Sequence, residues 1–150
     1  MNQNHYRRLL VMTVLSFISM YTLTYVMVAT LDHVYININK FYMAGLMTAP
    51  MIVIELLLMG AMYPNKKLNA ALMGGSIVIG LVLLLFVRQQ TLIGDQQFLR
   101  SMIPHHAGAI LMCEQASVKD PELVELCQSI IASQQEEIDI MKAKLADLNE

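Results

Sequence analysis

The sequence has no tryptophan, few charged residues and only two cysteines. Charged side chains make up 15% of its 150 residues and hydrophobic ones 56%, whereas about a quarter of the residues in a soluble globular domain are charged. This composition argues against an ordinary soluble domain and favours membrane segments. Two cysteines, Cys113 and Cys127, are too few for a disulfide framework.

A basic patch is also lacking. Residues 1–87 carry two acidic and five basic side chains, and residues 88–150 carry ten acidic and five basic ones. Nucleic-acid binding needs clustered lysines and arginines to neutralise phosphates. The distribution therefore excludes nucleic acid as an expected partner and marks the second part of the chain as an acidic segment.

Three apolar stretches are long enough to cross a bilayer, which needs about 20 residues of helix. They cover residues 9–31, 41–63 and 68–87. We expect a membrane domain over 1–87, a linker over 88–94 and a helical domain outside the membrane over 95–150. The lipid bilayer is then the first expected partner.

Positive charges indicate the orientation of these spans. Arg7 and Arg8 precede the first span, and Lys66 and Lys67 lie between the second and third. Loops rich in lysine and arginine stay in the cytoplasm. Three crossings then put the N-terminus in the cytoplasm and residues 95–150 outside it, which for a bacterial inner-membrane protein is the periplasm.

Glu55 lies near the middle of the second span, where a carboxylate is costly. Residues four apart share a helix face, so Glu55 falls on one line with methionines, namely Met43, Met47, Met51 and Met59. One interpretation is a proton or soft-metal route through an oligomer. The other is an uncharged Glu55 hydrogen-bonded to a neighbouring span, with methionine as ordinary apolar packing.

Residues 95–150 predict two helices joined by a short turn. Asp95 is a candidate N-cap, Pro104 is expected to bend or interrupt the first helix, and Asp120 followed by Pro121 predicts the start of the second. Two helices alone cannot shelter their apolar stripes, so we expect a homodimer or higher oligomer that completes a four-helix bundle. Cys113 and Cys127 flank the turn almost symmetrically, so they are candidates for a disulfide or for metal ligation.

Side chains of the types that bind metals cluster within one third of the circumference of the first helix. They are Met102, His105, His106, Met112 and Cys113. Gln134, Glu137 and Met141 share a face of the second helix and could close over them. Thioether with imidazole suits copper, with Cu(I) favoured by sulfur and Cu(II) tolerated by imidazole. Zinc fits less well.

The stretch Asp95-Gln-Gln-Phe-Leu-Arg-Ser-Met102-Ile-Pro-His105-His106-Ala-Gly-Ala-Ile-Leu-Met112, with the segment from Gln134 to Met141, resembles the family called domain of unknown function three hundred and five. The resemblance implies a ferritin-like helical fold similar to CopM-like copper-binding proteins of bacterial periplasms. It further implies copper ligands at Met102, His105, His106, Met112 and Met141, with Gln134 and Glu137 beside them. Cys113 and Cys127 depart from the family pattern.

The main functional hypothesis is a membrane-tethered copper-binding protein that serves copper buffering, tolerance or handover, with a copper donor or acceptor protein as a further partner. An alternative is a component of a metal transport assembly that uses the line of methionines around Glu55. A structural helical interaction module is the third. No pairing of a nucleophile with a base indicates catalysis, so an enzyme is not expected.

Overall fold

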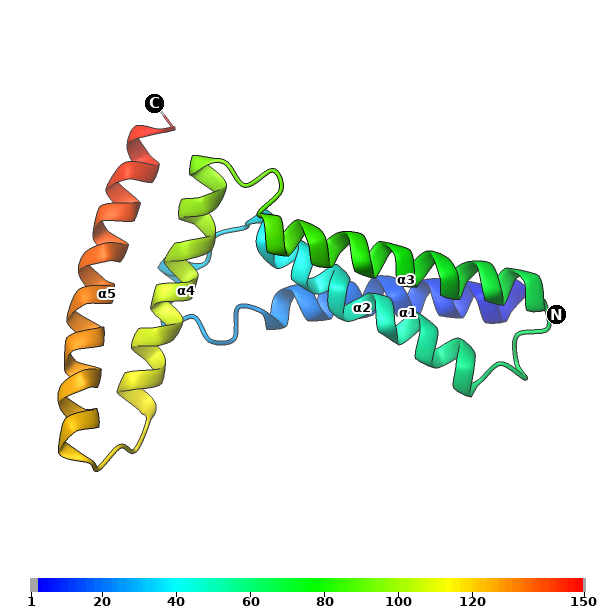
Figure 1. The fold of residues 1–150 in the computed structure, drawn as a ribbon, viewed down its shortest axis with the longest axis horizontal. Coiled ribbons are helices and arrows are strands. Elements are labelled where there is room, and N and C mark those ends of the chain that lie inside the picture. Colours follow the sequence, from blue (N-terminus) through cyan, green and yellow to red (C-terminus); the bar gives the residue numbers. More distant parts are fainter. Residues whose placement is uncertain (1–2, 150) are drawn as a thin grey trace. The chain divides into compact units, whose positions relative to one another are not determined.

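The structure is a computed structural model that describes residues 3–149. These residues form α1 (Gln3–Leu23), the short 3-10 helix η1 (Leu31–His33), α2 (Ile38–Leu58), α3 (Lys66–Gln89), α4 (Asp95–Gln115) and α5 (Pro121–Asp147) (Figure 1). The expected all-helical class is confirmed, since the described range contains no strand.

The chain divides into two compact units. The three-helix unit comprises α1 together with Asn39–Thr91, and the hairpin unit comprises Tyr25–Ile38 together with the chain from Leu92 onward. The chain therefore passes into the hairpin unit twice, once between α1 and α2 and once after α3.

In the three-helix unit, polar contacts join the helices at both ends. At one end the Tyr6 hydroxyl donates to Oδ1 of Asn69 at 2.8 Å, and Nδ2 of Asn69 donates to the carbonyl of Tyr63 at 2.9 Å. At the other end the Tyr42 hydroxyl donates to the carbonyl of Thr91 at 3.0 Å. The start of α1 thus lies beside the turn between α2 and α3.

Two helices, α2 and α3, are long and apolar enough to cross a membrane. They correspond to the spans expected over 41–63 and 68–87, although α2 ends earlier, at Leu58. Most of their residues are not buried within the chain, as expected of helices that face lipid rather than a soluble core.

The expected span over 9–31 is wrong in its bounds. The helix begins at Gln3, includes Arg7 and Arg8, and ends at Leu23. Its uncharged part is too short for the roughly 20 residues of a full crossing. A turn follows from Thr24, and residues 25–38 belong to the hairpin unit. An uninterrupted apolar stretch in the sequence therefore does not correspond to one helix.

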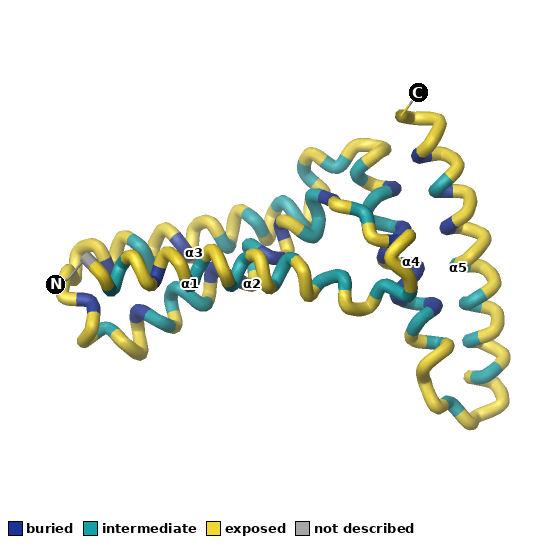
Figure 2. Tube along the Cα trace, turned by 180° about the vertical axis from the view of Figure 1, so that it is seen from behind, coloured by how far each residue is buried: buried dark blue, intermediate teal, exposed yellow. Residues whose placement is uncertain are grey.

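The hairpin unit is built on a seam between antiparallel α4 and α5. Seam positions are spaced alternately four and three residues apart, as in packed helix pairs. They are Leu99, Ile103, His106, Ile110 and Cys113 on α4, and Cys127, Ile131, Gln134, Ile138, Met141 and Leu145 on α5. Ile103 and Ile138 are completely buried, and Figure 2 shows buried positions in dark blue on both α4 and α5.

Residues 25–38 form a strap that packs on this hairpin. Val28 and Tyr35 contact the seam core, and the backbone N–H of Ile38 donates to Oε1 of Gln97 at 3.0 Å. A Cβ on Gly108 would lie 3.4 Å from the carbonyl oxygen of Met27, so the strap approaches α4 closely there. The strap gives the hairpin apolar cover within a single chain.

Pro104 does not interrupt its helix, contrary to expectation, because α4 is continuous from Asp95 to Gln115. Proline has no N–H to donate to the carbonyl four residues earlier, which is that of Arg100. Nδ2 of Asn37, from the strap, donates to this carbonyl at 3.3 Å. A tertiary contact thus satisfies the group that the proline leaves free.

Helix ends agree with the sequence in one case and differ in the other. The Asp120 carboxylate accepts from the N–H groups of Glu122 and Leu123, which confirms the predicted start of α5. The N-cap of α4 is Gly94, and Asp95 is the first helical residue. A carboxylate in that first turn still interacts favourably with the helix dipole.

Candidate functional site

His106 is the polar residue at the centre of the α4 side of the seam. It is 8% exposed, and its Nδ1 lies 3.1 Å from Oε2 of Glu137 on α5. This is an ion-pair distance, while no hydrogen bond of regular geometry reaches this buried nitrogen among the described residues. The Glu137 carboxylate is therefore the charged neighbour of this ring nitrogen.

The electrostatics favour a neutral imidazole. Burial lowers the pKa of His106 and His105 lowers it further, while the Glu137 carboxylate acts in the opposite direction. A neutral ring with its proton on Nδ1, the nitrogen beside the carboxylate, would keep a lone pair on Nε2. This is the arrangement by which carboxylates orient histidine ligands in metal proteins.

Two methionines lie one helical turn from this pair. Met141 is buried in the seam core, and Met102 is partly buried against the same core. Met102 precedes His106 by four residues and Met141 follows Glu137 by four. The structure thus brings an imidazole and two thioethers of the sequence-predicted set to neighbouring positions across α4 and α5.

Other predicted ligands lie away from the seam. His105 is exposed, with its ring centroid 6.0 Å from that of His106. Met112 is 60% exposed and lies about 15 Å along the helix axis from Met102, at 1.5 Å per residue. Helical angle alone groups Met112 with Met102 because it ignores this axial separation, whereas His105 differs from His106 in its exposure.

The remaining predicted residues take intermediate positions. Gln134 is half-buried on the seam, and Glu137 is exposed apart from its contact with His106. Cys113 and Cys127 are free thiols, both half-buried. Within residues 3–149, no three His, Cys, Asp or Glu side chains come together as a potential metal-binding group, so a metal site built on His106 would draw on thioether sulfur.

His33 is a buried residue of the hairpin unit that the sequence did not single out. Its Nδ1 lies 3.3 Å from the Thr30 hydroxyl, and burial, followed by the nearby Lys142, lowers its pKa. Sequence reasoning placed it in a loop directly after a membrane span. Nothing in the local pattern indicates that the strap buries it.

Glu55 has a different partner from the one expected. Its Oε1 accepts a hydrogen bond from the Tyr63 hydroxyl at 3.0 Å, and Tyr63 lies in the turn after α2 rather than on another span. On the methionine line, Met43, Met47 and Met59 are exposed. Within one chain these side chains do not enclose a route.

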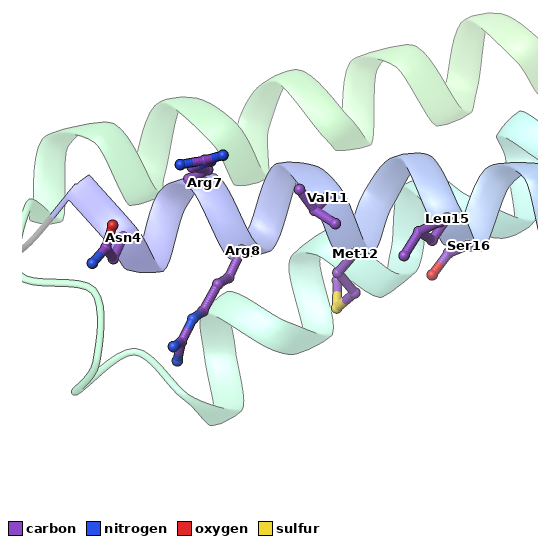
Figure 3. Close-up of a pocket in the computed structure, with 7 residues that line it drawn as sticks. All are labelled: Asn4, Arg7, Arg8, Val11, Met12, Leu15 and Ser16. Atoms are coloured by element: carbon purple, nitrogen blue, oxygen red, sulfur yellow. The ribbon is translucent and has the colours of Figure 1, made fainter.

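A separate groove of about 610 Å³ runs along α1 (Figure 3). It is lined by Asn4, Arg7, Arg8, Val11, Met12, Leu15 and Ser16. In Figure 3 the two arginine side chains leave the helix in different directions. The groove shares no residue with the cluster around His106 and contributes nothing to that site.

The structure defines a helical protein with two candidate membrane spans and a helical hairpin that carries a histidine–methionine cluster. A family model, "Domain of unknown function (DUF305)", matches residues 89–145, which include nearly all of α4 and α5. The chain belongs to this family.

A curated relative extends the likeness beyond the hairpin. The chain is 34% identical over 140 residues to "Uncharacterized protein L153" of Acanthamoeba polyphaga mimivirus. The alignment covers 91% of this chain and 90% of the relative. An alignment of that length includes residues of the candidate membrane helices as well as the hairpin. No solved structure matches the chain significantly.

Proposed function

We propose that this protein is a membrane-tethered copper-binding protein whose hairpin unit takes up Cu(I). The observation that carries the proposal is the 3.1 Å contact between His106 Nδ1 and the Glu137 carboxylate. A buried imidazole oriented in this way presents Nε2 as a preorganised nitrogen ligand.

The sulfur ligands of the proposal are Met102 and Met141. Thioethers are soft ligands that favour Cu(I), and imidazole binds both oxidation states of copper. Both methionines lie in or against the seam core, where little water competes for the ion, and each is four residues from His106 or Glu137. Gln134 and Glu137 support the site, while His105 and Met112 are exposed residues suited to a first encounter with the ion.

The membrane helices would act as the tether. Contacts of Tyr6 with Asn65 and Asn69 support an arrangement in which Arg7 and Arg8 share one end of the three-helix unit with Lys66 and Lys67. By the positive-inside rule that end faces the cytoplasm. The hairpin then lies on the opposite side, which in a bacterium is the periplasm, where it buffers copper or passes it to another protein.

Exposed apolar side chains of α5 support self-association as part of this proposal. Leu123, Leu126 and Ile140 are each about half exposed or more. Packing against a second hairpin would bury them in a four-helix bundle. Light scattering of the detergent-solubilised protein would give the number of chains per particle.

The test is a competitive Cu(I) titration of the full chain in detergent under reducing conditions. We expect His106→Ala to weaken Cu(I) binding by at least about tenfold, because it removes the oriented ligand. His105→Ala is the matched control, since it deletes the exposed neighbouring ring and should have a much smaller effect. Equal affinities of wild type and His106→Ala would refute the proposal.

A further inference from the structure

We propose that Cys113 and Cys127 form a reversible intrachain disulfide that joins α4 to α5 at the turn end of the seam. The proposal concerns a modification site and does not depend on copper. Its substrates are the two thiols and an external disulfide, such as that of an oxidised thiol oxidoreductase or of oxidised glutathione.

The register of the seam brings the two cysteines to its turn end. Cys113 continues the four-three spacing of buried α4 positions after Ile110, and Cys127 begins the same spacing on α5 before Ile131. The two cysteines are therefore the seam positions nearest the turn on each helix. Side chains at such positions point toward the partner helix, as knobs do in packed helix pairs.

The two thiols also interact directly. A side-chain hydrogen bond joins the thiols of Cys113 and Cys127. Sulfur atoms close enough to interact in this way need only small side-chain rotations to reach bonding distance. Both residues are half-buried free thiols, so a small disulfide can reach them.

The two cysteines and one external disulfide are sufficient for a balanced reaction. One cysteine, as its thiolate, attacks the external disulfide R–S–S–R, forms a mixed disulfide and releases one thiolate R–S⁻. The second cysteine then attacks the cysteine sulfur of the mixed disulfide and releases the second R–S⁻. The chain loses two protons and two electrons, the external disulfide becomes two R–SH molecules, and one S–S bond replaces another.

The structural consequence is confined to the hairpin. The bond would close a loop that contains only the last residues of α4, the turn and the first residues of α5. It would hold Cys113 and Cys127 at a fixed separation and suppress fraying of the helix ends at the turn. Such a bond requires little distortion of the helices, because the seam already brings the two cysteines together.

The experiment uses metal-free full-length protein in detergent with a chelator present. After incubation with oxidised glutathione at pH 8, we expect the intact mass to fall by two hydrogens and both thiols to resist alkylation. Peptide mapping should find Cys113 joined to Cys127 of the same chain. Addition of reduced glutathione in excess should restore two alkylatable thiols.

The matched control moves one thiol off the seam by a single position. The double variant Leu126→Cys with Cys127→Ser keeps two cysteines but places one at an exposed position of α5. We expect this variant to collect glutathione adducts instead of an internal bond. The single variants Cys113→Ser and Cys127→Ser should each carry one adduct.

Three outcomes would overturn the proposal. They are free thiols in the wild type under conditions that modify the control, a stable glutathione adduct on the wild type, and a bond that links two chains. None of these results bears on Cu(I) binding at His106, so failure here and failure of the proposed function are distinguishable.

Discussion

The side-chain amide of Asn37 lies 3.3 Å from the carbonyl oxygen of Arg100, the carbonyl that Pro104 leaves without a helical donor. Asn37 is only 2% exposed and also donates to the carbonyl of Tyr35 at 2.9 Å. One asparagine of the strap thereby allows a proline to stand inside a continuous helix.

This contact predicts that Asn37 and Pro104 are energetically coupled. Asn37→Ala should destabilise the hairpin unit by about 1–3 kcal/mol, because it leaves a partly buried carbonyl unsatisfied. In a Pro104→Ala background the restored N–H can bond to Arg100 within the helix, so Asn37→Ala should cost less. Amide hydrogen exchange in α4 of the four proteins of the cycle measures the difference. Identical costs in both backgrounds would contradict the coupling.

Glu137→Gln tests the orienting role of the carboxylate. We expect the variant to bind Cu(I) about 10- to 100-fold more weakly, as is typical when a carboxylate behind a histidine ligand is altered. Glu136→Gln changes the charge of the adjacent exposed residue by the same amount and should bind like wild type. Equal weakening by both substitutions would indicate a general charge effect and not orientation of His106.

Much of the fold could be predicted from sequence because helices leave a local signal. The apolar periodicity and the Asp120–Pro121 start predicted α5 closely, and the long apolar runs predicted α2 and α3. The strap could not be predicted this way. Its residues continue the apolar run of α1, and the contacts of Val28, Tyr35 and Asn37 that remove it from a membrane span are made with α4, far along the chain.

The candidate site shows the same limit. Spacing predicted that His106, Met102, Met141 and Glu137 belong together, and they occupy neighbouring positions in the hairpin. Spacing also grouped Met112 with them, although it is exposed and lies ten residues, nearly three helical turns, from Met102. Spacing in the sequence gives the direction in which a side chain leaves the helix but not its neighbours along the helix axis. Those neighbours depend on the packing of α5 and the strap.

The two fully buried isoleucines of the seam predict where the stability of the hairpin resides. Ile138→Ala should lower the free energy of unfolding of the hairpin unit by about 2–5 kcal/mol, through lost burial and a cavity. Ile140→Ala is the matched control, because the same side chain two residues along α5 is 62% exposed; its effect should stay within about 0.5 kcal/mol. Hydrogen exchange of α4 and α5 amides gives both values. Comparable losses would place Ile138 outside the core.

His33 predicts a pH dependence of the strap. Burial and Lys142 lower its pKa below 6.5 in the folded chain, while Asp32 and Asp139 oppose this effect. The unfolded strap therefore binds a proton more readily than the folded one. The folded strap therefore has its full stability with respect to His33 above pH 6.5. This stability is lost as the pH falls from 6.5 through the lowered pKa of His33.

We expect hydrogen exchange of residues 25–38, corrected for intrinsic rates, to become faster as the pH falls from 7.5 to 5. His33→Gln keeps a polar side chain that does not titrate, so its exchange should depend less on pH. Some dependence should remain, because the pKa of His106 is lowered in the same unit. His105→Gln, at an exposed position, should behave like wild type. An unchanged pH profile in His33→Gln would mean that protonation of His33 does not loosen the strap.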